Sequence, residues 1–145
     1  MTGFVLDASL TATWLFEDEA TPATEALLDT LATAGAITPP LWEYEVANLL
    51  VSATRRRRVT PAQASRCLEL IARLPITVAH EMFASPVSAQ LVGVAARFDL
   101  TAYDAAYLWL AERSGLALGT VDRRLATAAQ AAGVVVLPGA VATAP

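Results

Sequence analysis

Short apolar runs alternate with longer amphipathic stretches along almost the whole chain. The runs at 3–7, 36–38, 76–78, 116–118 and 134–137 are brief and aliphatic or β-branched, which is typical of buried strands. Between them, apolar residues recur at helical spacing and predict helices over 8–19, 21–35, 41–58, 60–74, 87–98, 103–115 and 122–132. Short strands alternating with helices predict an α/β sandwich with a mainly parallel central sheet.

The chain has 145 residues, a length that suits one domain. We interpret 1–137 as a single domain, with Trp14, Leu15 and Phe16 in its core, and 138–145 as a flexible tail. The longest uninterrupted apolar run, Ala105 to Ala111, is far shorter than the roughly 20 residues of a membrane-spanning helix. Since no basic segment precedes an apolar one at the amino terminus, we expect a cytoplasmic protein without a secretory signal.

Composition narrows the possible chemistry. One cysteine and one histidine allow neither a disulfide framework nor a Cys/His zinc site, so any metal ion has to be held by oxygen. The net charge of −4 is the opposite of what a duplex-binding module carries. All ten cations are arginines, which excludes lysine chemistry. The run 55–58 is most simply a solvated helix end, while Arg123 and Arg124 are better candidates for phosphate contacts.

Three aspartates are expected at one edge of the sheet, because ligands bind at the carboxyl ends of parallel strands. Asp7 ends the first strand, Asp122 follows the fourth, and Asp104 lies in the first turn of an apolar helix. Each also has a plain structural interpretation: Asp7 and Asp122 as helix N-caps, and Asp104 as part of a capping box with Thr101.

Glu45 is the more informative acid. Its neighbours one helical turn away are mostly apolar, so its carboxylate projects from the buried side of the predicted helix, where a lone charge is costly. Glu43 lies roughly 200° around the same helix and has the plainer role of a solvated residue. Four carboxylates near one edge repel one another unless cations lie between them, and an oxygen-only set suits Mg²⁺ or Mn²⁺.

Four segments that contain these acids, VLDAS (5–9), PPLWEYEVANLL (39–50), LTAYDAAYLWLAE (100–112) and LGTVDRRLATAAQAAGVVVL (118–137), resemble the acidic motifs of PIN-domain ribonucleases. They are most similar to those of VapC-type toxins of bacterial toxin–antitoxin pairs. The resemblance spans nearly the whole chain in the family's order. It places the family's catalytic and metal-binding acids on Asp7, Glu45, Asp104 and Asp122, and its supporting hydroxyls on Ser9 and Thr120.

The resemblance implies a PIN-like three-layer sandwich and Mg²⁺-dependent cleavage of single-stranded or loop RNA (transfer, ribosomal or messenger RNA) to 5′-phosphate and 3′-hydroxyl products. Mn²⁺ is a possible substitute. It also implies a homodimer and a VapB-like antitoxin whose segment fills a groove between the first helices and the helix after the one that carries Glu45.

Other functions stay open at this stage. The absence of lysine argues against a phospho-acceptor receiver domain, and Asp7-Ala8-Ser9 lacks the Asp-x-Asp of a haloacid-dehalogenase-type phosphatase. A free-standing PIN-like RNA-processing nuclease and a non-catalytic interaction module on the same fold remain alternatives. The presence of all four acids favours an active enzyme.

Overall fold

A computed structural model describes residues 3–139, and its centre is a parallel sheet of five short strands. The strands are β1 (Phe4–Leu6), β2 (Ala36–Thr38), β3 (Ile76–Val78), β4 (Ala117–Gly119) and β5 (Val136–Leu137). Their order across the sheet is β3-β2-β1-β4-β5, and each pairs with its neighbours in parallel. The predicted α/β class is therefore confirmed, and β1 lies at the centre of the sheet.

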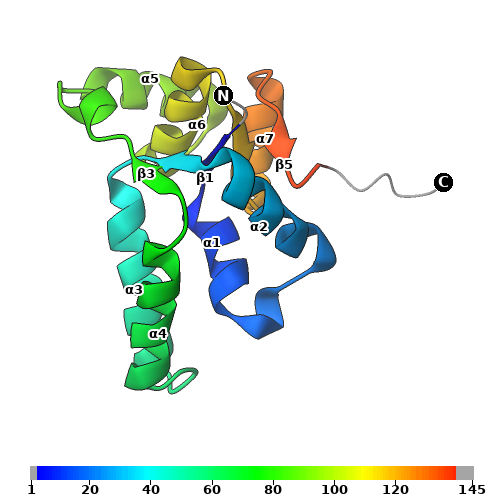
Figure 1. The fold of residues 1–145 in the computed structure, drawn as a ribbon. Helices are drawn as coiled ribbons and strands as arrows, with labels where there is room; N and C mark the ends of the chain where they lie inside the picture. Colours follow the sequence, from blue (N-terminus) through cyan, green and yellow to red (C-terminus); the bar gives the residue numbers. More distant parts are fainter. Residues whose placement is uncertain (1–2, 140–145) are drawn as a thin grey trace.

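Seven α-helices surround this sheet in the described part of the chain: α1 (Ala8–Leu15), α2 (Pro22–Ala34), α3 (Leu41–Arg55), α4 (Pro61–Ala72), α5 (Ser88–Phe98), α6 (Ala102–Ser114) and α7 (Arg123–Ala131). Figure 1 shows α5 and α6 on one side of the strands, and α1, α3 and α4 on the other. None of the helices within 3–139 has the length and apolar character needed to cross a bilayer. Of the expected tail, Pro138 and Gly139 follow β5, and 140–145 lie outside the described residues.

The helix expected over 8–19 is shorter than predicted. Phe16 adopts an extended conformation after α1 and buries its ring, and the 3₁₀ turn η1 (Glu17–Glu19) follows. Trp14 and Leu15 were expected in the core and are half-buried. The indole N–H of Trp14 donates a 2.8 Å hydrogen bond to the carbonyl of Thr24, so this ring joins α1 to α2 at the rim of the core.

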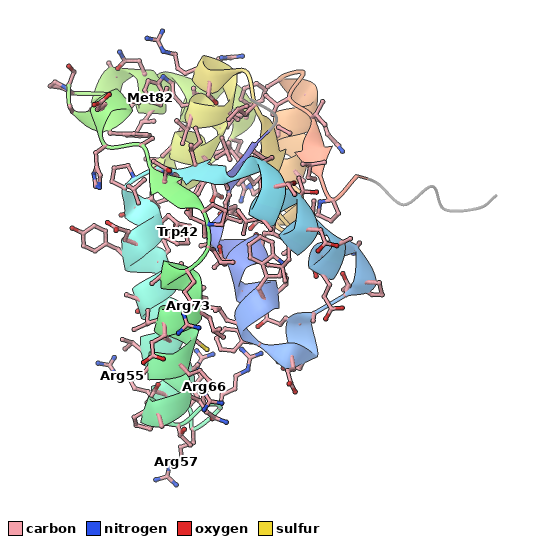
Figure 2. The ribbon with its side chains drawn as sticks, viewed as in Figure 1. Trp42, Arg55, Arg57, Arg66, Arg73 and Met82 are labelled. Atoms are coloured by element: carbon pink, nitrogen blue, oxygen red, sulfur yellow. The ribbon has the colours of Figure 1, made fainter. Side chains whose placement is uncertain are left out.

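The central helix α6 is buried nearly all round, as its apolar composition predicts. Ala105 through Ala111 are all buried, and Tyr107 among them is fully enclosed. A second chain of contacts fixes α3 against α1. The indole of Trp42, labelled in Figure 2, donates to the Thr11 hydroxyl at 3.0 Å, and that hydroxyl donates to the Asp7 carbonyl at 3.2 Å.

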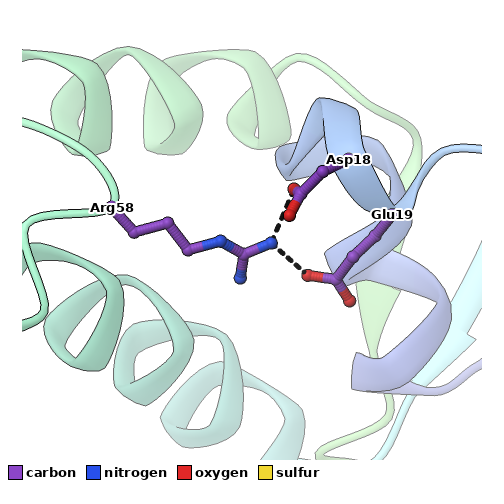
Figure 3. A network of polar contacts seen from close by, with 3 residues as sticks. All are labelled: Asp18, Glu19 and Arg58. Atoms are coloured by element: carbon purple, nitrogen blue, oxygen red, sulfur yellow. Dashed lines mark hydrogen bonds and ion pairs between the residues drawn. The ribbon is translucent and has the colours of Figure 1, made fainter.

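The turn between α3 and α4 is tied back to η1 by Arg58. One guanidinium nitrogen lies 2.6 Å from Oδ1 of Asp18 and 2.9 Å from Oε2 of Glu19, as Figure 3 shows. The guanidinium carbon also lies 4.2 Å from the centre of the Phe16 ring. The expectation that 55–58 is a solvated helix end therefore holds for exposed Arg55, Arg56 and Arg57, while Arg58 anchors the turn.

Candidate active site

Asp7 lies where β1 passes into α1, with only 5% of its surface exposed. Although it occupies the N-cap position, its side chain makes no capping hydrogen bond, so the simple capping interpretation is wrong. Its Oδ2 instead accepts hydrogen bonds from Ser9 Oγ at 2.6 Å and Thr120 Oγ1 at 2.7 Å. Its Oδ1 receives no side-chain hydrogen bond within the described residues. Burial raises the pKa of this carboxyl most, and a hydrogen bond from the Ala8 backbone is one of the contacts that lower it.

The Ser9 and Thr120 hydroxyls also hold the loop that follows β4. Ser9 Oγ accepts from the Val121 N–H and Thr120 Oγ1 accepts from the Asp122 N–H, both at 3.1 Å. Each hydroxyl has one hydrogen and donates it to Oδ2 of Asp7. The two hydroxyl oxygens lie 3.1 Å apart, but neither has a hydrogen left to donate to the other. This arrangement, which we call the hydroxyl clamp, joins Asp7 to the backbone that carries Asp122.

Asp122 combines a structural role with a position in the site. Its Oδ1 accepts from the Leu125 N–H at 2.9 Å, so the expected capping of α7 is present. Its charge also raises the pKa of Asp104 and that of Asp7. For Asp7 the largest cause of the raised pKa is burial, opposed by the two hydroxyl hydrogen bonds.

Asp104 is half-exposed in the first turn of α6. The Thr101 hydroxyl accepts from its backbone N–H at 3.1 Å and caps the helix, but the reciprocal half of the capping box is absent. The Asp104 carboxylate is therefore left without a capping role. Burial, followed by the charges of Asp122 and Asp7, raises its pKa to about 6, and Arg124 acts in the opposite direction.

Glu45 lies half-buried in α3, as its helical phase predicts, and Glu43 is exposed. The Tyr107 hydroxyl donates a 2.6 Å hydrogen bond to Oε1 of Glu45. Burial raises the pKa of Glu45 most, the hydrogen bond from Tyr107 lowers it, and the charges of Asp7 and Asp104 raise it further. Since both aspartates influence this carboxylate, the four acids form one electrostatically coupled group.

Tyr107 is a site residue that the sequence interpretation missed. It lies three residues after Asp104 and therefore on the same side of α6. A tyrosine in an otherwise apolar and buried helix needs a hydrogen-bond partner for its hydroxyl. This requirement is the feature of the sequence that points to Tyr107 as a site residue. Burial, and next the charge of Asp7, raise the pKa of this phenol, so it stays protonated and acts as a donor.

The two arginines beside Asp122 differ in their surroundings. Arg124 donates a 2.8 Å hydrogen bond to Asp99, and both side chains are exposed. Arg123 is exposed and has no ion pair among residues 3–139. Both line a surface pocket of about 490 Å³ with Phe98 and Thr127, next to the start of α7. Their suggested contact with phosphate stays a prediction.

The donor set fits a hard divalent cation. Within the described residues, no three acidic, histidine or cysteine side chains are arranged as a ready metal site. Mg²⁺, however, usually keeps several waters and is held by only one or two carboxylates together with substrate phosphate. Carboxylate oxygens of Asp7, Asp104 and Asp122 that accept no side-chain hydrogen bond in the described residues meet that requirement. Burial, together with the charges of neighbouring acids, raises the pKa values of Asp7 and Asp104, and a cation would relieve that accumulation of negative charge.

Three comparisons with known proteins agree with this geometry. The chain is 38% identical over 82 residues to a Pyrobaculum aerophilum protein named Exonuclease VapC9, a match that covers 57% of this chain and 58% of that relative. Its fold is similar to the crystal structure of PAE2754 from Pyrobaculum aerophilum, with a TM-score of 0.70, 28% identity, and coverage of 93% of this chain and 89% of the other. The PIN domain family model matches residues 4–131, which include all four acids. The chain is thus a member of the PIN domain family.

Proposed function

We propose that this chain is a metal-dependent ribonuclease that cleaves single-stranded or loop RNA, and that it acts as a VapC-type toxin. The observation that carries the proposal is the gathering of acids around Asp104, whose pKa is raised to about 6 by burial and, after it, by the charges of Asp122 and Asp7. Clustered carboxylates of this kind destabilise the fold unless they serve a bound cation, and perturbed carboxylates gather at functional sites. Membership of the PIN domain family supports the same conclusion.

In this proposal Asp7, Glu45, Asp104 and Asp122 hold Mg²⁺, with Mn²⁺ as a substitute. When bound, the cation supplies a more acidic water and stabilises charge on the phosphate. The chain's own residues supply orientation: the hydroxyl clamp fixes Oδ2 of Asp7, and Tyr107 fixes Oε1 of Glu45. Arg123 and Arg124 contact the phosphate backbone next to the cut.

We further propose endonucleolytic cleavage that leaves a 5′-phosphate and a 3′-hydroxyl. The relative from Pyrobaculum is named an exonuclease, so the two modes have to be separated directly. A circular single-stranded RNA has no ends and is cut only by an endonuclease. The purified chain should linearise it with Mg²⁺ or Mn²⁺ and fail to do so in EDTA.

Asp104→Asn is the variant that tests the site, because it removes one coupled charge without breaking a hydrogen bond in the described residues. Loss of cutting in Asp104→Asn, with an unchanged fold by circular dichroism, supports the proposal. Full activity in EDTA contradicts it, and so does equal activity of the variant. Degradation of linear RNA alone favours an exonuclease, and no RNA cleavage at all favours a non-catalytic interaction module.

The proposed partners are a VapB-like antitoxin and a second copy of the chain, within the cytoplasm. A groove of about 520 Å³ between α1 and α4, lined by Leu15, Phe16, Cys67 and Leu70 among others, suits an antitoxin segment. A basic antitoxin side chain near the four acids would compete with Mg²⁺. Expression should arrest growth, and co-expression of an antitoxin frame encoded upstream should relieve it. A monomer whose expression harms cells equally with that frame would instead be a free-standing nuclease.

A further inference from the structure

Positive charge is concentrated in one part of an otherwise acidic chain. Residues 55–73 carry six arginines against one acid, Glu69, a net charge of +5, whereas the rest of the chain carries four arginines against thirteen acids, a net charge of −9. The six are Arg55, Arg56, Arg57, Arg58, Arg66 and Arg73. In Figure 2, Arg55 and Arg57 lie at the end of the α3–α4 hairpin that is farthest from the sheet.

Of the four arginines at 55–58, one is engaged within the chain and three can bind a ligand. Arg58 forms ion pairs with Asp18 and Glu19, which fix the turn. Arg55, Arg56 and Arg57 are exposed and have no ion pair among residues 3–139. Adjacent like charges repel one another, so a bound polyanion would relieve that repulsion.

Helix α3 connects these arginines to the acidic site along one face. At 3.6 residues per turn, Asn48, Ser52 and Arg56 lie within about 60° of the direction of Glu45. The Arg56 N–H bonds to the Ser52 carbonyl at 3.0 Å, so the helical path continues to Arg56. Asn48 is exposed and Ser52 half-exposed. From Glu45 to Arg56 this face is about 16 Å long, the span of a few nucleotides.

We propose that this polar face of α3, the α3 track, binds the backbone of the RNA strand on one side of the cut, with Arg56 contacting its phosphates. The inference rests on the proposed ribonuclease function and adds where the substrate extends. Guanidinium groups bind phosphate in a bidentate manner, and Asn and Ser side chains bind phosphate and sugar. An RNA strand that reaches the acids has a negative charge at every nucleotide, so it presents phosphates along the whole track.

A protein segment is the competing occupant, and the apolar groove beside the track is the surface that suits it. The groove between α3 and α4 is mostly apolar, about 440 Å³, and its lining includes Val51, Leu68 and also Arg55, which lies roughly 80° around α3 from Glu45. Val51 lies roughly 120° around α3 from Glu45, so a segment in that groove does not lie on the track. Substitutions on the two faces of α3 therefore separate the two occupants.

The test measures binding of a fluorescein-labelled 20-nucleotide single-stranded RNA of mixed sequence by anisotropy, in EDTA, across a range of NaCl concentrations. Losing the phosphate contact of Arg56 in Arg56→Gln should reduce the slope of log affinity against log salt by about 0.7. Arg66→Gln removes the same charge from α4 and should leave the slope unchanged. Ser52→Asp should weaken binding several-fold, whereas Val51→Asp, the neighbouring position off the track, should match the parent.

Equal slopes for Arg56→Gln and Arg66→Gln would overturn the α3 track, as would stronger weakening by Val51→Asp than by Ser52→Asp. A change of oligomeric state in Arg56→Gln without a change of slope would also overturn it. Cleavage is scored separately with Mg²⁺. If the chain binds RNA with the expected slopes but never cuts it, the proposed nuclease function is wrong and the α3 track stands. If the chain cuts RNA but the two arginine variants have equal slopes, the nuclease function stands and the α3 track is wrong.

Discussion

The Tyr107 hydroxyl donates a 2.6 Å hydrogen bond to Oε1 of Glu45, joining the buried helix α6 to the acid of α3. Tyr107 is fully buried, whereas Glu45 is half-buried, so the phenol determines where the carboxylate lies. One oxygen of Glu45 is used in this bond, and the other is left for a ligand. The same bond opposes the rise in the pKa of Glu45 that burial causes, and thereby favours the ionised form at neutral pH.

Tyr107→Phe should therefore affect both stability and activity. A hydrogen bond to a charged group contributes about 1.5 to 3 kcal/mol, and we expect a loss in the free energy of unfolding on that scale. Activity should fall roughly 10- to 100-fold, as for other residues that orient metal ligands. The acidic limb of the pH–rate profile should move to higher pH, because the pKa of Glu45 rises. Urea unfolding and the pH–rate profile measure these effects. Tyr103→Phe, at a side chain 69% exposed, is the matched control and should change neither.

The pair Glu43 and Glu45 tests the helical phase of α3. Glu45→Gln removes a charge from the coupled group and should lower activity roughly 100-fold, the scale on which misplacing one active-site group acts. Glu43→Gln removes the same charge from an exposed position of the same helix and should stay near the parent, with stability changed by about 0.5 kcal/mol or less. Cleavage of the circular RNA measures both variants. The opposite order of activities would show that Glu43, not Glu45, serves the site.

Thr120 should be sensitive to loss of its hydroxyl but not of its methyl group. Thr120→Val keeps the shape and removes both the hydrogen bond to Asp7 and the acceptor for the Asp122 N–H. Thr120→Ser keeps both bonds. We expect activity and metal affinity of Thr120→Val to fall roughly 10- to 100-fold, and those of Thr120→Ser to stay close to the parent. Mg²⁺ titration of activity checks this. Equal effects of the two variants would mean that the hydroxyl clamp has no part in positioning Asp7.

The sequence predicted most of the fold because its strands and helices each carry a strong local pattern. Five apolar runs became the five strands, within one or two residues at their ends. The clearest error was the helix over 8–19, which ends at Leu15 because Phe16 leaves the helix to bury its ring. That choice depends on a pocket built by α3 and α4, far along the chain, so a local pattern could not show it.

The candidate acids were predicted from their places at strand and helix ends, but their partners were not. The periodicity of α3 separated Glu45 from Glu43 correctly, since helical phase is a local property. The bond between Tyr107 and Glu45 spans 62 positions, and that between Thr120 and Asp7 spans 113. The resemblance suggested Ser9 and Thr120 as supporting residues. Which atoms they contact depends on the pairing of β1 with β4, which sequence spacing does not give.

The pH dependence of the metal-free chain follows from the raised pKa of Asp104. Folding raises that pKa from 3.8 to about 6, so between these values the folded chain binds more protons than the unfolded chain. The contribution of Asp104 to stability is therefore most favourable at low pH and is lost as the pH rises through about 6. The raised pKa values of Asp7 and Glu45 act in the same direction.

In EDTA, the melting temperature of the parent should decrease from pH 5 to pH 7.5. Asp104→Asn should have a higher melting temperature than the parent at pH 7.5, and its melting temperature should depend less on pH. In the proposed function Mg²⁺ binds the ionised carboxylates, so the rise in melting temperature on adding Mg²⁺ should be larger at pH 7.5 than at pH 5. Differential scanning fluorimetry of both proteins with EDTA or Mg²⁺ tests this. A parent that becomes more stable from pH 5 to pH 7.5 in EDTA, with no difference in Asp104→Asn, would show that these carboxylates do not repel one another in the folded chain.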